Sequence, residues 1–215
     1  MIELAVYALI AVFIFSRLYH SLGKAPILGF KNQPSNVIDN RVKIEDEENK
    51  DENITDYIDQ NNDDLIKAGI AAIKSKDKNF SVKSFMRGAS AVFDFIIKAF
   101  NIGNLEQLKY LLDSNLYSLF EQEIKKHQEL SEIHESTIVS IKSQKIVEIK
   151  LVKNTAFIAV NFLSEQINYA KNQSDELISG SISKINKVED TWQFKKNITS
   201  SKPKWLLTSI NYSIS

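Results

Sequence analysis

Apolar and polar positions divide this chain into three stretches of different character. The first contains an unbroken apolar run from Leu4 to Phe15, and with its flanking residues the apolar segment reaches about 19 residues. A helix that crosses a bilayer needs about 20 such residues, so residues 1–22 are predicted to form a transmembrane anchor. The side chains expected to face lipid or headgroups are Leu4, Val6, Leu9, Ile10, Val12, Phe13, Phe15 and Arg17.

Two alternatives to a retained anchor are a cleaved signal peptide and a buried core helix. A signal peptide begins with a basic segment, but only Glu3 precedes this run, and no small-x-small cleavage site follows it. A core helix would carry a polar flank, which the run lacks. Arg17, Lys24 and Lys31 follow the run and no basic side chain precedes it. The positive-inside bias therefore places the C-terminal part in the cytoplasm, or in the matrix of an organelle.

The second stretch, residues 23–64, is predicted to be a flexible acidic linker. It is dense in charge, as in Glu45 to Glu48, and poor in large apolar side chains. Such a segment cannot bury enough surface to offset its loss of conformational entropy, and repulsion between its carboxylates extends it.

In the third stretch, residues 65–215, apolar positions first recur every three or four residues, which is typical of helices. A first helix is expected from Leu65 to Lys74, with Asp63 or Asp64 as its cap. A second helix, capped by Ser81 or Ser84, buries one face. The apolar positions of that face are Phe85, Ala89, Val92, Phe93, Ile96, Ile97 and Phe100.

Two shorter helices are expected next. Gly103 suits the left-handed position that ends a helix, and Asn104 can cap a helix over Leu105 to Leu112. A polar break from Asp113 to Asn115 follows, and helical spacing resumes from Leu116 to Gln128.

After Glu135 the apolar period changes from about 3.6 to 2, which is typical of strands. Turn signals stand at Lys153–Asn154 and at Asn172 to Glu176. The predicted strands are Ser136–Glu148, Ile149–Ala170, Ser183–Lys196 and Pro203–Ser213. Helices followed by strands indicate an α+β domain in which the helices cover one face of a four-stranded antiparallel sheet.

Both tryptophans lie in the last two predicted strands. Asp190, Trp192 and Phe194 are two residues apart and therefore share one face of their strand. Trp205 and Leu207 share a face of the next strand, so the two indole rings are expected on the same buried face of the sheet.

Composition adds constraints on partners. The chain has no cysteine, which excludes disulfides and cysteine-ligated zinc. Residues 65–215 carry 21 Lys and Arg against 15 Asp and Glu, so a basic domain follows an acidic stem. This excess fits either contact with anionic lipid or an ordinary solvated surface. The candidate lipid-facing residues are Lys67, Lys74, Lys76, Lys78 and Lys83.

We find no pattern that predicts catalysis, a metal site or a cofactor. His127 and His134 lie near the end of a charged helix, and His20 flanks the apolar run, so all three are expected at the surface. Asp190 is the one carboxylate on an apolar sheet face, where burial would raise its pKa and suit it to act as a general base. The alternative is a structural carboxylate that accepts hydrogen bonds at a sheet end or pairs with Arg87.

Several segments between about residues 80 and 212 together form a further pattern. They are Phe85–Ala89, Ala99–Phe100, Gly103–Leu105, Leu111–Phe120, Ser136–Ile141, Asp190–Lys195 and Pro203–Leu207. Through these segments the chain resembles the Tim44-like domain family, the C-terminal domain of the mitochondrial inner-membrane translocase subunit that tethers the import motor. The tryptophan pair after a helical start is its most specific part. The chain departs from the family pattern modestly, with Asn104 at a usual aspartate and Lys195–Lys196 near an arginine position.

The resemblance implies a cystatin-like cone of helices on a curved sheet, with a large apolar cleft. The residues expected to line that pocket or groove are Phe85, Phe93, Ile97, Asp190, Trp192 and Trp205. Relatives in alphaproteobacteria share the anchor, linker and domain layout, which implies a single-pass protein of a bacterial inner membrane with a cytoplasmic domain.

We therefore expect a non-enzymatic, membrane-anchored adaptor. Its domain would bind anionic lipid, or a translocase, chaperone or ribosome partner in protein transport, and no DNA. One alternative is a small-molecule-binding or catalytic cone that uses Asp190 in an apolar pocket. Another is a groove that takes an apolar peptide segment.

Overall fold

The computed structural model describes residues 54–201 and 204–211. The predicted anchor, with its residues from Leu4 to Arg17, and residues 23–53 of the predicted linker lie outside the described residues. Within residues 54–201 and 204–211, no helix combines the length and hydropathy needed to cross a bilayer.

The helical part follows the predicted order. The helices are η1 (Ile54–Tyr57), η2 (Gln60–Asn62), α2 (Asp63–Lys76), α3 (Val82–Asn101), α4 (Leu105–Lys109) and α5 (Ser114–Leu130). The expected caps form at α3 and α4, where the side chains of Ser81 and Asn104 accept backbone N–H groups of Ser84 and Gln107. Gly103 has the expected left-handed conformation, with φ of 65°.

The start of α2 differs from the prediction. Its N-cap is Asn62, and Asp63 and Asp64 occupy the first turn. Ordered structure also begins earlier than residue 65, because η1 and η2 precede α2 and Ile58 is buried against Ile146 of the sheet. Residues 54–64, which the sequence assigns to the linker, therefore pack on the domain.

The sheet is antiparallel throughout, which confirms the α+β class with helices packed on such a sheet. Its strands are β1 (Ile133–Val152), β2 (Thr155–Lys171), β3 (Leu177–Gly180), β4 (Asn186–Asn197) and β5 (Leu206–Ile210). The order is β1-β2-β4-β5, and β3 pairs with the end of β2 beyond β4. The prediction of four strands is wrong, because a short strand, β3, forms between the turn at residues 172–176 and β4.

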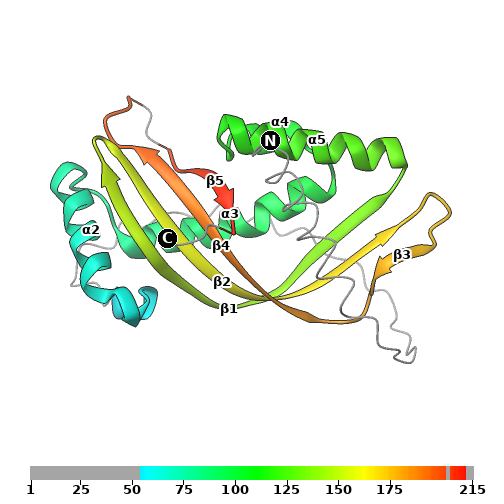
Figure 1. Ribbon diagram of the computed structural model, residues 1–215, viewed down its shortest axis with the longest axis horizontal. Helices are drawn as coiled ribbons and strands as arrows, with labels where there is room; N and C mark the ends of the chain where they lie inside the picture. The colour runs from blue at the N-terminus through cyan, green and yellow to red at the C-terminus, as the bar shows by residue number, and fades with distance from the viewer. Residues whose placement is uncertain (1–53, 202–203, 212–215) are drawn as a thin grey trace, which may run out of the picture.

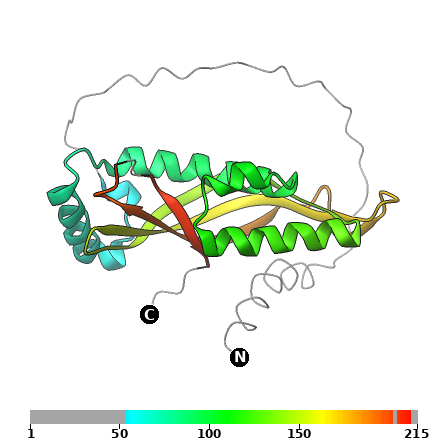
Figure 2. The ribbon, with the colours of Figure 1, turned by 90° about the horizontal axis from the view of Figure 1, so that it is seen from above.

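Strong curvature shapes the sheet. The pairing of β1 with β2 slips at three places, between Ile138 and Ser140, Ile141 and Ser143, and Ile146 and Glu148. Such irregularities bend a strand and increase its twist. Figure 1 shows the resulting arc, with α3 and α5 lying over its inner side and α2 at one end of the molecule. Seen from above, α3 and α5 flank the strands (Figure 2).

Helix α2 can pack closely on β1 because residue 69 is glycine. A Cβ at Gly69 would overlap the side chain of Ile149 and would lie 2.9 Å from its carbonyl oxygen. Ile66, Ile70 and Ile73 form the buried face of α2.

Two ion pairs join the helical corners to β4. Lys195 Nζ donates to Asp113 at 2.9 Å, where α4 turns into α5, and Lys196 Nζ donates to Asp77 at 2.7 Å, after α2. Asp113 is buried and also caps α5 by accepting the N–H of Leu116. These contacts fix the positions of the helix ends relative to β4, the strand that carries Asp190 and Trp192.

Candidate functional site

A cavity of about 380 Å³ lies between α3 and α5 on one side and the inner face of the sheet on the other. Both helices present apolar side chains to it, as their spacing predicts. The apolar residues of its wall are Ile96, Ile97, Phe100, Leu119, Phe120, Val188, Trp192 and Ile210. Such a space suits an apolar ligand or side chain.

Polar groups also line the cavity, and several of them lie near the end of α5 and the start of β1. They come from α3, α5, three strands and the residue after β5, and they include both acidic and basic side chains. These residues are Asn101, Glu123, His127, His134, Glu135, Ser136, Gln166, Asn168, Tyr169, Asn186, Lys187, Asp190 and Asn211. The cavity is therefore amphipathic.

Trp192 forms part of the wall and rests on an aromatic cluster. The ring of Phe93 lies 4.6 Å from the Trp192 ring and stacks on Phe162 at 4.5 Å between centroids. The Trp192 Nε1–H is buried and has no hydrogen-bond acceptor among the described residues. A buried donor without an acceptor is uncommon and marks a position where a ligand atom could accept a hydrogen bond.

Asp190 also lies on the cavity wall, and only 7% of its surface is exposed. Its position beside Trp192 on β4 agrees with the predicted alternation of side chains. Arg87, which the sequence suggested as its partner, is exposed on α3.

Two histidines stack at the polar end of the cavity. The rings of His127 and His134 are parallel to within 5°, with centroids 3.8 Å apart. His127 Nε2 lies 3.1 Å from Glu123 Oε1, and His134 Nε2 lies 2.7 Å from Glu132 Oε2. Each imidazole therefore has a carboxylate beside it.

This environment shifts three pKa values. The hydrogen bond from His127 lowers the pKa of Glu123, and burial lowers the pKa of His134. The Tyr169 hydroxyl donates to Glu135 at 2.6 Å, and this hydrogen bond raises the pKa of Tyr169 to about 12. Glu123 is thus ionised and Tyr169 protonated at neutral pH.

The prediction that His127 and His134 lie at the surface is wrong, since only 13% and 11% of their side chains are exposed. The charged neighbours of His127 suggested a solvated helix end. The spacing held a contrary signal, because His127 follows Phe120 by seven residues and Ile124 by three, which places it on the buried face of α5. No local spacing indicated the burial of His134. This residue is buried because the chain reverses after α5 and places it against His127.

The structure divides the six expected pocket residues into three groups. Ile97, Asp190 and Trp192 lie on the wall of the cavity, and Phe93 packs behind Trp192. Phe85 and Trp205 instead contact each other, with ring centroids 4.7 Å apart.

This second aromatic cluster includes Phe80 and Phe194. Phe80 lies 6.2 Å from the Trp205 ring, and Phe194 meets Phe85 edge-on at 5.8 Å. Phe194 also lies 6.5 Å from the Trp192 ring, so it joins this cluster to the one behind the cavity wall.

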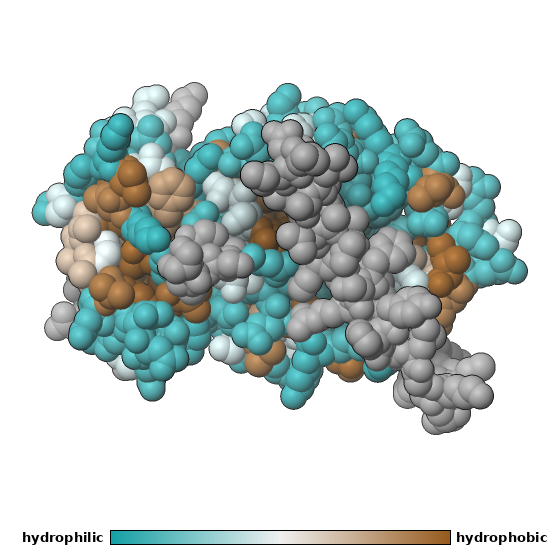
Figure 3. Space-filling model, viewed as in Figure 1, coloured by the Kyte–Doolittle hydropathy of each residue, from teal (hydrophilic) through white to brown (hydrophobic). Residues whose placement is uncertain are grey.

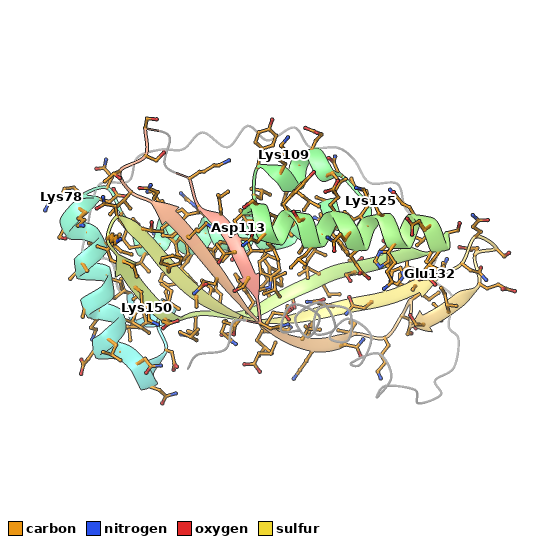
Figure 4. All side chains as sticks on the ribbon, turned by 45° about the horizontal axis from the view of Figure 1, so that its top comes forward. Lys78, Lys109, Asp113, Lys125, Glu132 and Lys150 are labelled. Carbon is orange, nitrogen blue, oxygen red and sulfur yellow. The ribbon has the colours of Figure 1, made fainter. Side chains whose placement is uncertain are left out.

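The five candidate lipid-facing lysines are all exposed. Lys67 and Lys74 are seven residues apart and share one side of α2. The side chain of Lys76 reaches the β1–β2 turn, where its Nζ donates to the carbonyl oxygen of Lys153 at 2.7 Å. Lys78 lies at the α2 end of the molecule, far from Glu132 at the other end (Figure 4).

Within residues 54–201 and 204–211, no group of three or more histidine, aspartate or glutamate side chains is arranged to hold a metal ion. The arrangement offers a recessed, partly open apolar surface with hydrogen-bonding groups beside it, which is a geometry for binding.

Comparison with known proteins identifies the domain. A family model described as the Tim44-like domain matches residues 66–212. The chain belongs to the Tim44-like domain family. The match includes α3, α5 and β4, so every helix and strand that forms the cavity lies inside it.

A curated relative and a solved structure add further findings. The chain is 23% identical to the uncharacterized protein RP434 of Rickettsia prowazekii (strain Madrid E), over 97% of this chain and 96% of that protein. A solved structure of the intermembrane space region of the chloroplast protein ARC6 is 12% identical, with a TM-score of 0.45, and covers 63% of this chain and 99% of its own.

Proposed function

We propose that this protein is a membrane-anchored, non-enzymatic adaptor. Residues 1–22 anchor it in a bacterial inner membrane, and residues 23–53 connect the anchor to a cytoplasmic domain. The domain binds anionic lipid, or holds a translocation, chaperone or ribosome partner at the membrane. The membership of residues 66–212 in the Tim44-like family, which is membrane-associated, is the observation that carries this proposal.

The sequence before the domain supports the anchored arrangement. The apolar run from Leu4 to Phe15 has about the length of a membrane span. The residues between anchor and domain reach roughly 30 Å as a flexible coil, so the domain can touch both the bilayer and a neighbouring complex. Cell fractionation tests the anchor, and recovery of the intact protein in the soluble fraction would reject it.

Lipid binding by α2 and the turn after it can be tested with a version of the protein that begins at residue 23. Replacing Lys67, Lys74 and Lys78 with glutamine should weaken its binding to anionic vesicles on the order of tenfold or more, because each well-placed lysine contributes about 1 kcal/mol. Added salt should weaken the unmodified protein similarly. A matched control replaces three lysines elsewhere, Lys98, Lys109 and Lys125. Equal binding by both triple variants would reject this surface.

Partner binding requires the anchored protein in native membranes. Crosslinking followed by affinity purification should recover one recurrent translocase, chaperone or ribosome component. Recovery that changes from one preparation to the next, with no recurrent component, would reject the adaptor role.

A second candidate function is binding of a small apolar molecule in the cavity, because Asp190 lies on its wall and the Trp192 Nε1–H has no acceptor among the described residues. A fluorescent apolar probe should bind the protein, and Ile97→Trp, which fills the cavity, should reduce that binding. Asp190→Asn tests whether the cavity also catalyses a reaction. If the unmodified protein turned over a substrate and Asp190→Asn did not, an enzyme would be favoured over an adaptor.

A further inference from the structure

Exposed aliphatic side chains gather at the end of the molecule that carries β3. Six large aliphatic residues in two short parts of the chain, 130–133 and 177–185, are each 50–62% exposed. We call this set the β3-end patch, and its members are Leu130, Ile133, Leu177, Ile178, Ile182 and Ile185. Figure 3 shows apolar surface at this end of the molecule.

Strand pairing brings these separate segments together. Ile133 opens β1 directly after the end of α5 and pairs with Lys171 of β2, and Lys171 pairs in turn with Leu177 of β3. The three residues form a row across the sheet. Its face is opposite to that of His134, which points to the cavity, because successive side chains alternate. Ile178 follows Leu177 on β3 and therefore points to the other face, so this end of the molecule carries aliphatic side chains on both faces of the sheet. Ile182 and Ile185 follow in the connection from β3 to β4.

Charges beside the patch balance one another. Segments 129–133 and 171–187 contain three lysines and four carboxylates. Lys171 pairs with Asp175 at 2.6 Å, and Glu132 lies 2.7 Å from the ring of His134. An electrostatic partner is therefore disfavoured, and the energy of any contact here must come from the aliphatic groups.

We propose that the β3-end patch inserts its aliphatic side chains into the outer part of the bilayer to which the protein is anchored. This inference rests on the proposed membrane anchoring, and it adds a second contact with lipid that does not depend on charge. It also limits the orientation of the domain, because the end that carries β3 must then lie at the membrane surface.

Size and shape favour a bilayer over a second copy of the chain. Six half-exposed aliphatic side chains offer roughly 400 Å², about half of what each partner contributes to a stable protein interface. The β2–β3 hairpin projects beyond the end of α5 (Figure 1). A projecting end can enter the interfacial 5–10 Å of a bilayer without desolvating the rest of the domain.

The absence of cysteine from the sequence makes the test direct, because each introduced cysteine is a unique labelling site. The full chain is reconstituted in vesicles with Ile182→Cys or Leu177→Cys, labelled with an environment-sensitive fluorophore. Leu65→Cys on α2 and Val152→Cys at the β1–β2 turn are matched controls, since both positions are also exposed aliphatics. Lipids that carry a quencher in the upper acyl chain report contact with the bilayer.

In zwitterionic vesicles, to which the lysines of α2 are not attracted, we expect labels in the patch to be quenched about twofold or more and the control labels hardly at all. Quenching should be equal in zwitterionic and anionic vesicles and insensitive to salt, unlike binding by the α2 lysines. Carbonate extraction of the same vesicles tests the anchor separately. If the protein stays in the membrane but the patch labels are not quenched, the insertion is refuted while the anchoring stands.

A double variant gives an independent measurement. Ile178→Ser with Ile182→Ser should abolish quenching at Leu177→Cys, whereas Leu65→Ser with Val152→Ser should leave it unchanged. Energy transfer between patch labels on different molecules that persists in detergent and depends on protein concentration would instead identify a second copy as the occupant, and would overturn the proposal.

Discussion

His127 and His134 stack with parallel rings 3.8 Å apart and so join the end of α5 to the start of β1. Between them the chain reverses through Ser131, whose φ is 57°. The two imidazoles form a wall of the polar end of the cavity. The shape of that end therefore depends on two titratable rings remaining in contact.

The free energy of unfolding should depend on the protonation of His134. Burial lowers its pKa below the ordinary 6.5, so the unfolded chain takes up a proton at a higher pH than the folded protein. Stability is expected to fall as the pH drops below about 6.5, and this loss should end once the pH is below the lowered pKa. Urea unfolding at a series of pH values measures the effect.

His134→Asn should remove this part of the pH dependence. The loss of stability from Glu123, whose pKa is lowered from 4.5, should remain, because it occurs only at more acidic pH. An unchanged profile between pH 5 and 7 in His134→Asn would contradict the assignment.

Asp113 should be a stability determinant, because it caps α5 and pairs with Lys195 at the same time. Asp113→Ala removes the cap and leaves the Lys195 ammonium without its partner, so a loss of about 2–4 kcal/mol is expected in chemical denaturation. Asp113→Asn keeps a capping oxygen and should lose less. The exposed pair of Lys67 with Asp63 is the control, and Lys67→Met should cost much less than Asp113→Ala.

Phe93 should support the cavity wall. Its ring is fully buried between Phe162 and Trp192, so Phe93→Ala is expected to destabilise the protein by about 3–5 kcal/mol. The fluorescence of Trp192 should also change, because the indole loses a packed neighbour. Phe93→Leu refills part of the volume and should recover at least about half of the loss. Equal losses in both variants would show that the aromatic contact itself is required.

Glu135 should control the ionisation of Tyr169. The hydroxyl donates to this carboxylate, and ionisation would place two negative charges side by side, so the pKa is raised to about 12. Glu135→Gln removes the negative charge and should return the pKa of Tyr169 toward its ordinary value of 10.0. NMR of ring-labelled tyrosine follows the titration, with the exposed Tyr110 as an internal control.

The helices could be predicted from sequence because their determinants are local. The apolar spacing from Phe85 to Phe100 and the caps at Ser81 and Asn104 involve residues within one or a few turns. The change of period after Glu135 likewise predicted the sheet. The burial of Ile58 could not be predicted, because its partner Ile146 is far away in the sequence and its neighbours are acidic.

The candidate site could be predicted only in part. Alternation along β4 placed Asp190 and Trp192 on one inward face, and the structure has both on the cavity wall. The position of Trp205 against Phe80 and Phe85 depends on where β5 begins, and this strand starts only at Leu206. The histidine stack depends on the reversal after α5, a tertiary feature that spacing alone does not describe.

The two-residue turn at Lys153 and Asn154 has a consequence for how the molecule assembles. Once this turn closes, each successive pair from Val152–Thr155 to Ile133–Lys171 forms beside one already made. The long β1–β2 hairpin can therefore form progressively from its turn, with little loss of loop entropy at each added pair. Its last pairs, next to the histidines, are expected to form latest and to fray first, so hydrogen exchange should be fastest where the polar end of the cavity opens.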